Sequence, residues 1–249
     1  MTTLRSSRRP RRKRILGVLA AVLAVAGLIC TNASALHLFG SVPTRIYPAQ
    51  GKPLPIAAVM VSGDMGFGHG MSLHFAQALA QRGVTVVGVV APYVFAQHRT
   101  LPQARYAVEH AMLRAMQLTG AQSLILVGQS YGADIVATVA PQLPASLMRH
   151  VAAIDLMVPG RYVYFRADTS GLAYLGKPDA LPAAALNQTR KPPLVCIYGV
   201  EEDDSLCPLV TRPANVIGLP GGHHLEHNHE LLVETALGAL HAYVPELKP

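Results

Sequence analysis

Residues 123–136 read Ser-Leu-Ile-Leu-Val-Gly-Gln-Ser-Tyr-Gly-Ala-Asp-Ile-Val, and no other segment of the chain says as much about its fold. The apolar run at 123–127 predicts a buried strand, and the residues after Gly132 resemble the start of a helix. Between them lies a G-x-S-x-G pentapeptide, which in such a context is typical of a nucleophile elbow. A turn this sharp exposes the Ser130 hydroxyl, and its glycines let neighbouring segments approach where a Cβ would collide. The ordinary alternative is a Gly/Ser-rich turn that closes a strand–helix unit.

Strands and helices alternate along the rest of the chain. Strands are expected at 56–61, 84–90, 123–127, 151–158, 194–198 and 215–219, and helices at 71–81, 102–118 and 230–243. This alternation predicts a mostly parallel sheet covered by helices on both faces. With no internal repeat or long linker, residues 36–249 are expected to form a single α/β domain. We expect it to begin with a β-hairpin within 36–55, and the proline-rich loops of 159–193 leave room for no more than a small cap.

Polar side chains follow the later strands at the point where each one ends. Asp203 and Asp204 come after the fifth expected strand, and His223 and His224 come after the sixth. The carboxyl ends of parallel strands meet at one edge of a sheet, so these groups are expected to approach Ser130. The chain order Ser…Asp…His is that of α/β-hydrolases. The fold class expected is therefore of the α/β-hydrolase type.

The histidine is predicted to act as the base. A serine hydroxyl is a weak nucleophile, so a neutral imidazole must accept its proton as the attack proceeds. His223 follows Gly221-Gly222 directly and is the first choice, with His224 as the alternative.

The imidazolium that forms needs an oriented carboxylate behind it. We assign this role to Asp204, because it opens an Asp-x-x-x-Pro spacing common after this strand in hydrolases. Asp203 is the next candidate, and Glu202 is a further one. Asp155 is the outsider, because it is expected within a strand rather than beyond one. An acidic run such as 201–204 also has an ordinary interpretation as a solvated surface loop.

A tetrahedral intermediate needs two N–H donors for its oxyanion. One is expected from the amide of Tyr131, the residue after the nucleophile. The second is expected from the loop after the first core strand, at Asp64 or Met65.

The N-terminus carries nearly all of the excess charge. The formal net charge is +7, and seven basic residues with no acid lie in the first 35 positions, which leaves 14 basic and 14 acidic residues beyond them. A neutral remainder gives no electrostatic support to nucleic-acid binding. The basic cluster, the apolar run 15–30 and Ala33-Ser34-Ala35 match the three parts of an export signal. We expect residues 1–35 to direct the chain to the periplasm and the mature chain to begin near Leu36, with retention of the segment as an inner-membrane anchor as the alternative.

Removing Cys30 with the signal leaves two cysteines, Cys196 and Cys207. In an oxidising compartment these two can form a disulfide. The alternative is a buried strand thiol and an unrelated loop thiol.

A histidine cluster raises the question of a metal site. It comprises His223, His224, His227 and His229. The first and third would share one face only on a helix, and the preceding Gly221-Gly222 favours a loop. We therefore predict no metal and no cofactor.

Several motifs together resemble the VirJ/AcvB family of exported bacterial virulence proteins, within the α/β-hydrolase group. They are Ser62-Gly63-Asp64, Tyr93-Val94-Phe95 with Arg99-Thr100-Leu101-Pro102, Gly128-Gln129-Ser130-Tyr131-Gly132-Ala133-Asp134, Cys196-Ile197-Tyr198-Gly199, Glu202-Asp203-Asp204-Ser205-Leu206-Cys207-Pro208, and Leu219-Pro220-Gly221-Gly222-His223-His224. Met65 stands where the family often has glycine, and Gln129-Ser130-Tyr131 where Tyr-Ser-Phe is usual.

The resemblance implies a serine hydrolase that cleaves aminoacyl-phosphatidylglycerol, notably the lysyl form, at the outer face of the inner membrane. The partner would then be a lipid head group, and an acidic pocket mouth formed by Asp64 and the 201–204 loop would suit a cationic acyl group. The family is also linked to type IV secretion, so the alternatives are an interaction or chaperone module for secretion-system proteins and an esterase or thioesterase for a small soluble substrate.

Overall fold

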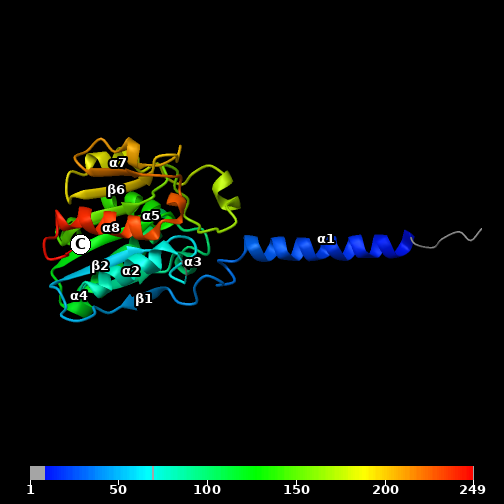
Figure 1. The fold of residues 1–249 in the computed structure, drawn as a ribbon, viewed down its shortest axis with the longest axis horizontal. Coiled ribbons are helices and arrows are strands. Elements are labelled where there is room, and N and C mark those ends of the chain that lie inside the picture. Colours follow the sequence, from blue (N-terminus) through cyan, green and yellow to red (C-terminus); the bar gives the residue numbers. More distant parts are fainter. Residues whose placement is uncertain (1–8, 69, 249) are drawn as a thin grey trace, which may run out of the picture.

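The computed structural model describes residues 9–68 and 70–248. The first eight residues of the predicted signal, including Arg5 and Arg8, lie outside the described part, as do His69 and Pro249. A long helix, α1 (Arg9–Thr31), projects from an α/β body that holds the other elements (Figure 1). Its apolar stretch Lys13–Thr31 is long enough to cross a membrane, as a signal sequence also can be, and none of it is buried in the body.

A seven-stranded sheet lies at the centre, in the order β1-β3-β2-β4-β5-β6-β7. Its strands are β1 (Thr44–Tyr47), β2 (Ile56–Val61), β3 (Thr85–Val89), β4 (Ser123–Gln129), β5 (Val151–Met157), β6 (Leu194–Gly199) and β7 (Asn215–Leu219). Strand β1 runs antiparallel to β3, and all other neighbours are parallel. The hairpin expected within 36–55 is wrong: this region supplies one strand, which pairs with the outer side of β3 and covers backbone groups that an edge strand leaves unpaired.

The helices of the body are α2 (Met71–Gln81), α3 (Ala91–Val94), α4 (Leu101–Thr119), α5 (Tyr131–Val139), α6 (Ala145–Met148), α7 (Ala183–Gln188) and α8 (His229–His241). Short 3-10 turns are η1 (Ala140–Gln142), η2 (Leu172–Leu175), η3 (Cys207–Leu209) and η4 (Leu225–His227). The bounds of α4 follow from its sequence. Thr100 and Gln103 form a reciprocal capping box at its start, and Gly120 ends it in a left-handed conformation.

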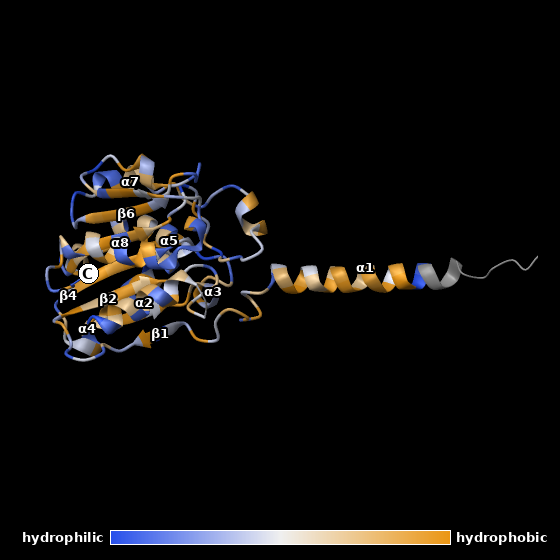
Figure 2. Ribbon diagram, viewed as in Figure 1, coloured by the Kyte–Doolittle hydropathy of each residue, from blue (hydrophilic) through white to orange (hydrophobic). Residues whose placement is uncertain are grey.

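Helices cover both faces of the sheet, as the alternating pattern predicts. Strand β2 is buried throughout, and its side chains alternate between two apolar cores. Ala57, Val59 and Val61 pack on the side of α4 and α5, whereas Ile56, Ala58 and Met60 pack on the side of α2 and α8. The strands are correspondingly apolar along their length (Figure 2).

The loops after β4, β6 and β7 meet at the carboxyl edge of the sheet, because these strands are close neighbours in it. The long connection from β5 to α7 passes over the same edge. It contains η2 and two isolated bridges, Gly160↔Ser205 and Val163↔Ala180, and forms no separate cap domain.

Candidate active site

Ser130 occupies a strained turn between β4 and α5. Its backbone angles are φ 52° and ψ −124°, which a non-glycine residue adopts rarely. Its amide donates a hydrogen bond to the carbonyl of Met157 over 2.8 Å. A Cβ on Gly132 would lie 2.0 Å from the carbonyl oxygen of Val61, so only glycine lets α5 start this close to β2. The geometry is that of the predicted nucleophile elbow.

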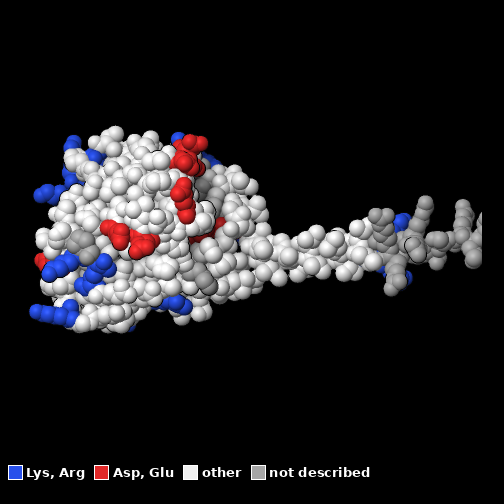
Figure 3. Space-filling model, in the orientation of Figure 1, with Lys and Arg blue, Asp and Glu red and all other residues white. Residues whose placement is uncertain are grey.

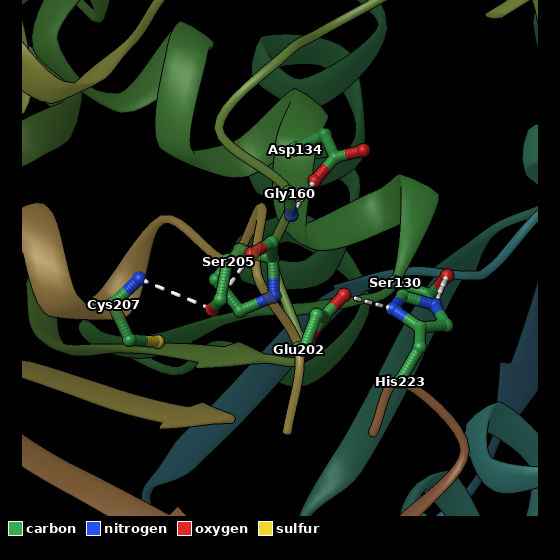
Figure 4. Close-up of polar contacts among 8 residues, drawn as sticks. Ser130, Asp134, Gly160, Glu202, Ser205, Cys207 and His223 are labelled. Atoms are coloured by element: carbon green, nitrogen blue, oxygen red, sulfur yellow. Dashed lines mark hydrogen bonds and ion pairs between the residues drawn. The ribbon is translucent and has the colours of Figure 1, made fainter. Parts of the chain in front are cut away.

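His223 connects Ser130 to a carboxylate (Figure 4). The Ser130 Oγ lies 2.8 Å from His223 Nε2, and His223 Nδ1 lies 2.5 Å from Glu202 Oε1. A carboxylate can only accept, so we assign the proton to Nδ1, which leaves Nε2 free to accept the serine proton. The structure therefore brings together the predicted serine and the predicted histidine.

The acid beside the histidine is Glu202 and not Asp204. The Glu202 side chain, in contact with His223, is 9% exposed, whereas Asp203 and Asp204 are exposed and make no hydrogen bond to His223. Asp204 contributes its backbone carbonyl, which accepts from the amide of Arg161 over 2.8 Å. Asp155 is buried inside β5, as expected for a residue within a strand, and it does not contact His223. The Asp-x-x-x-Pro spacing misled the assignment, because the turn after β6 directs its second acid, not its fourth, toward the histidine.

Contacts between two glycine-containing loops set this geometry. A Cβ on Gly199, at the end of β6, would lie 2.2 Å from the carbonyl oxygen of Gly222. Further along, the Glu201 amide donates to the Gly221 carbonyl over 3.0 Å. The loop that carries Glu202 is thus held directly against the loop that carries His223.

A disulfide between Cys196 and Cys207 fixes the far end of the Glu202 loop, which confirms the predicted pairing. The amide of Leu206 donates to the carbonyl of Pro159 over 2.8 Å, and Ser205 Oγ accepts from the Cys207 amide over 3.3 Å (Figure 4). A disulfide indicates a location outside the cytoplasm, as does the apolar N-terminal helix.

Asp134, in the first turn of α5, supports the same region from the other side. Its Oδ1 accepts a hydrogen bond of 2.7 Å from the amide of Gly160, which bridges to Ser205. Burial raises the pKa of Asp134 well above its ordinary value, and the Gly160 hydrogen bond only partly offsets this. Asp134 is not among the site residues predicted from the sequence. The sequence feature that could have identified it is that Asp134 is the single acid in the largely apolar segment 131–139.

The loop after β2 lies beside the elbow through a chain of hydrogen bonds. The amide of Gly63 donates to Ser72 Oγ over 3.1 Å, and the Ser72 hydroxyl donates to Gln129 Oε1 over 2.8 Å. The Gly63 amide is therefore occupied, while Asp64 and Met65 follow on the same loop. The amide of Tyr131 opens α5 and has no partner within that helix. The amide of Tyr131, together with that of Asp64 or Met65, stays the predicted pair of oxyanion donors.

The surroundings of His223 favour its protonated form. Burial alone lowers its pKa, but the hydrogen bond and negative charge of Glu202, joined by the charges of Asp64 and Asp204, raise the pKa above its ordinary value. A base with a raised pKa accepts the serine proton more readily.

Ser130 and His223 open into a pocket of about 710 Å³ with an acidic wall. Seven acids line it: Asp64, Asp134, Asp168, Glu201, Glu202, Asp203 and Asp204. Within the described residues, no Lys or Arg lines it. On the face drawn in Figure 3, one group of acidic side chains lies toward the α1 end of the body and a second lies near the middle, whereas Lys and Arg lie mainly toward the opposite end.

Asp64 stands on the wall of this pocket nearest the elbow. Burial raises its pKa above the ordinary value, which the charge of His223 and a 3.5 Å hydrogen bond from the Tyr174 hydroxyl partly offset. Asp64 therefore holds a poorly solvated carboxylate close to the reacting groups.

Neither His224 nor His227 joins the relay. His224 packs its ring edge-on against His223 at 5.5 Å and stacks on His227 at 5.6 Å, without contacting Ser130. Across residues 9–68 and 70–248, no group of three or more His, Cys, Asp or Glu side chains is placed to hold a metal ion.

Solved structures with a similar fold include proteins described as α/β serine hydrolases and esterases. Est1E from Butyrivibrio proteoclasticus, with ferulic acid bound, matches at a TM-score of 0.60 and 13% identity, over 81% of this chain and 95% of that one. A lidless α/β serine hydrolase, XC6422 from Xanthomonas campestris, matches at 0.55 and 14% identity, over 83% and 90%. An α-β serine hydrolase homologue from Coxiella burnetii matches at 0.55 and 15% identity, over 77% and 90%.

Fold and site together define an α/β-hydrolase-fold protein with a serine–histidine–carboxylate arrangement. Residues 55–244 match the family described as bacterial virulence protein (VirJ), and the chain belongs to that family. No curated protein matches it.

Proposed function

We propose that this chain is an exported serine esterase that hydrolyses the ester between an amino acid and the glycerol of phosphatidylglycerol. The observation that carries the proposal is the relay Ser130–His223–Glu202, with contacts of 2.8 and 2.5 Å, inside an acidic pocket. The relay supports acyl transfer, and the acidic wall supports a substrate whose acyl group is cationic.

The first step is attack by Ser130 Oγ on the ester carbonyl carbon. His223 Nε2 takes the hydroxyl proton, and Glu202 stabilises the imidazolium through Nδ1–H. The amide of Tyr131 and one from the loop after β2 stabilise the oxyanion. When the tetrahedral intermediate collapses, His223 returns the proton to the departing glycerol oxygen, which leaves the aminoacyl group esterified to Ser130.

In the second step, a water molecule hydrolyses the ester between the aminoacyl group and Ser130, and His223 again acts as base and then as acid. His223 removes a proton from a water molecule as it attacks the aminoacyl ester, and the proton then passes to Ser130 Oγ. The products are a free amino acid and anionic phosphatidylglycerol.

The acidic wall accounts for selection of the substrate over its product. Lysyl-phosphatidylglycerol carries a net positive charge and the alanyl form has an ammonium group, whereas unmodified phosphatidylglycerol is an anion. Carboxylates such as Asp64 attract the first two and repel the last. A poorly solvated pocket strengthens this discrimination, because charges interact more strongly at low dielectric.

The test is to incubate the purified full chain in mixed micelles with lysyl-, alanyl- and unmodified phosphatidylglycerol, and with neutral aryl esters. We expect release of the amino acid, with no release of fatty acid. Ser130→Ala should lower this turnover by at least about 10⁴-fold. Ser146→Ala is the matched control, because Ser146 is exposed on α6, which leads into the opposite edge of the sheet.

Turnover that survives Ser130→Ala would remove the mechanism. Hydrolysis of aryl esters alone would keep the esterase and reject the lipid substrate. Absence of turnover on every ester would favour the interaction module for secretion-system proteins.

A further inference from the structure

The segment after α1 is packed onto the pocket end of the body. Ala33 and Ser34 are buried, and the ring of His37 stacks on Tyr93 at 4.6 Å. Arg166, in the connection that lines the pocket, donates to the carbonyl of Thr31, the last residue of α1, over 3.3 Å. Figure 1 shows α1 leaving the body on the side of the connection from β5 to α7. Residues of that connection line the pocket, and Arg166 ties it to the end of α1.

Exposed apolar side chains surround the point where α1 leaves. In the connection from β5 to α7, Leu172 and Leu175 of η2 are 56% and 80% exposed. They flank Tyr174, whose ring lines the pocket. Leu36 and Leu38, just after α1, are exposed as well. Figure 2 shows η2 as an apolar turn at the α1 end of the body.

We propose that this end of the body is a membrane-docking face. α1 remains attached and spans the bilayer, while Leu36, Leu38, Leu172 and Leu175 enter the interfacial layer and hold the pocket against the lipid head groups. Resting on the proposed function, this face explains how an ester near the membrane surface reaches Ser130 without extraction of the lipid.

The length of α1 favours a bilayer as the occupant. Its apolar stretch Lys13–Thr31 has 19 residues, and at about 1.5 Å per residue it spans roughly 28 Å, close to the thickness of a hydrocarbon core. The basic residues that precede it stay on the cytoplasmic side, which places the body outside. A body fixed to the end of such a helix must face the membrane with the surface from which the helix leaves.

The charge distribution specifies how this face binds. Seven acids line the pocket at this end, against Arg166 and the exposed Lys177 in the connection from β5 to α7, so attraction to anionic lipids is not the main force that holds this face. The contact instead depends on burial of the leucines, each contributing through its apolar area. The two leucines of η2 are then the residues to probe.

Tryptophan fluorescence gives a direct test, because the chain contains no tryptophan. The variant Leu175→Trp, reconstituted as the full chain in vesicles, provides a single emitter. We expect its emission to shift to the blue and to be quenched by lipids brominated near the head group. Leu118→Trp is the matched control, since Leu118 is an exposed leucine near the end of α4, whose chain next enters the opposite edge of the sheet through β4.

If brominated lipid quenches the Leu175→Trp variant no more than it quenches the Leu118→Trp control, the proposal is overturned. A blue shift without lipid quenching would also overturn it, because a second copy or another protein would then cover the face. N-terminal sequencing of the protein from membranes is expected to begin within the first 13 residues. A start at Leu36 would show that α1 is removed and reject the anchor.

A second variant separates this proposal from the catalytic one. Leu172→Ser with Leu175→Ser should lower hydrolysis of the lipid substrate in vesicles by about tenfold while leaving hydrolysis of a soluble aryl ester within about twofold. Equal loss on both substrates would contradict docking. If no lipid ester is cleaved at all, the quenching result still decides the docking face by itself.

Discussion

The elbow that carries Ser130 and the loop that carries Glu202 place their side chains by different means. The elbow depends on a few neighbouring residues: a strand, two glycines and the start of α5, with Gly132 against β2. The Glu202 loop has no regular structure until η3, and contacts from distant segments position it. The nucleophile is therefore encoded locally, whereas the acid is encoded by tertiary contacts. Substitutions in the Glu202 loop test this difference best.

The largest expected effect separates Glu202 from its neighbour Asp204. Glu202→Gln keeps the shape but removes the charge behind His223, and should lower kcat by roughly 10³–10⁴-fold. Asp204→Asn, an equally conservative change on an exposed side chain of the same loop, should alter kcat by less than about threefold. Steady-state kinetics on an aryl ester measures both. The reverse ranking would restore Asp204 as the acid.

The disulfide should have the next largest effect. Cys196 and Cys207 are 11 residues apart, and on the chain-entropy model closing so short a loop stabilises the fold by about 2.5–3 kcal/mol. The double variant Cys196→Ser, Cys207→Ser should thus increase the unfolding equilibrium constant roughly 100-fold, as measured by urea denaturation.

Its control is Cys30→Ser, because Cys30 is a free, exposed cysteine on α1 outside the body. That variant should leave the denaturation midpoint unchanged. The kcat of the double variant, measured in the absence of urea, shows whether the disulfide is needed to position Glu202. If the disulfide positions Glu202, kcat falls as well, whereas an unchanged kcat would show that the contacts with Pro159 and Gly222 suffice.

These two regions also explain what the sequence could and could not predict. The alternation of apolar runs identified β2, α2 and β7 to the residue, because β2 and α2 bury regular patterns of side chains and β7 alternates partly buried with exposed residues before the buried Leu219. The G-x-S-x-G motif located Ser130, and two glycines before His223 placed the base. Such features are local, so a single sequence carries them.

The errors share one cause, which is dependence on distant partners. The choice among Glu202, Asp203 and Asp204 follows from the approach of Gly199 to Gly222, which no local pattern reveals. Likewise, the strand at 44–47 pairs with β3, some 40 residues later in the chain, rather than within a hairpin. The connection from β5 to α7 has no periodicity, so the sequence predicted only loops with room for a small cap and not that Asp168 and Tyr174 line the pocket.

A smaller effect concerns the acidic wall. Asp64→Asn removes one carboxylate beside the elbow and should reduce the preference for a lysyl over a neutral ester, expressed as the ratio of kcat/KM values, by roughly tenfold. Asp203→Asn should change the ratio by less, because Asp203 is exposed to solvent, whereas Asp64 is partly buried. An unchanged ratio in Asp64→Asn would assign recognition of the cation to the Glu202 loop.

The smallest expected effect is a shift in pH dependence. The base must be neutral to accept the serine proton, and its pKa is raised, so kcat/KM should fall with decreasing pH around a midpoint above 6.5, the ordinary value for histidine. Glu202→Gln removes the main cause of that rise and should move the midpoint to lower pH. Asp204→Asn should move it in the same direction but less, because Asp204 acts on His223 through charge alone.

The same raised pKa has the opposite consequence for stability. A group whose pKa is higher in the folded chain stabilises the fold at low pH, and this contribution disappears as pH rises through the folded value. The contact between His223 and Glu202 should therefore stabilise the protein most below pH 6.5, where kcat/KM is low. A pH midpoint that stays in place in Glu202→Gln would mean that Glu202 orients the imidazole without tuning its basicity, and the acid loop would then resemble the elbow in acting through position alone.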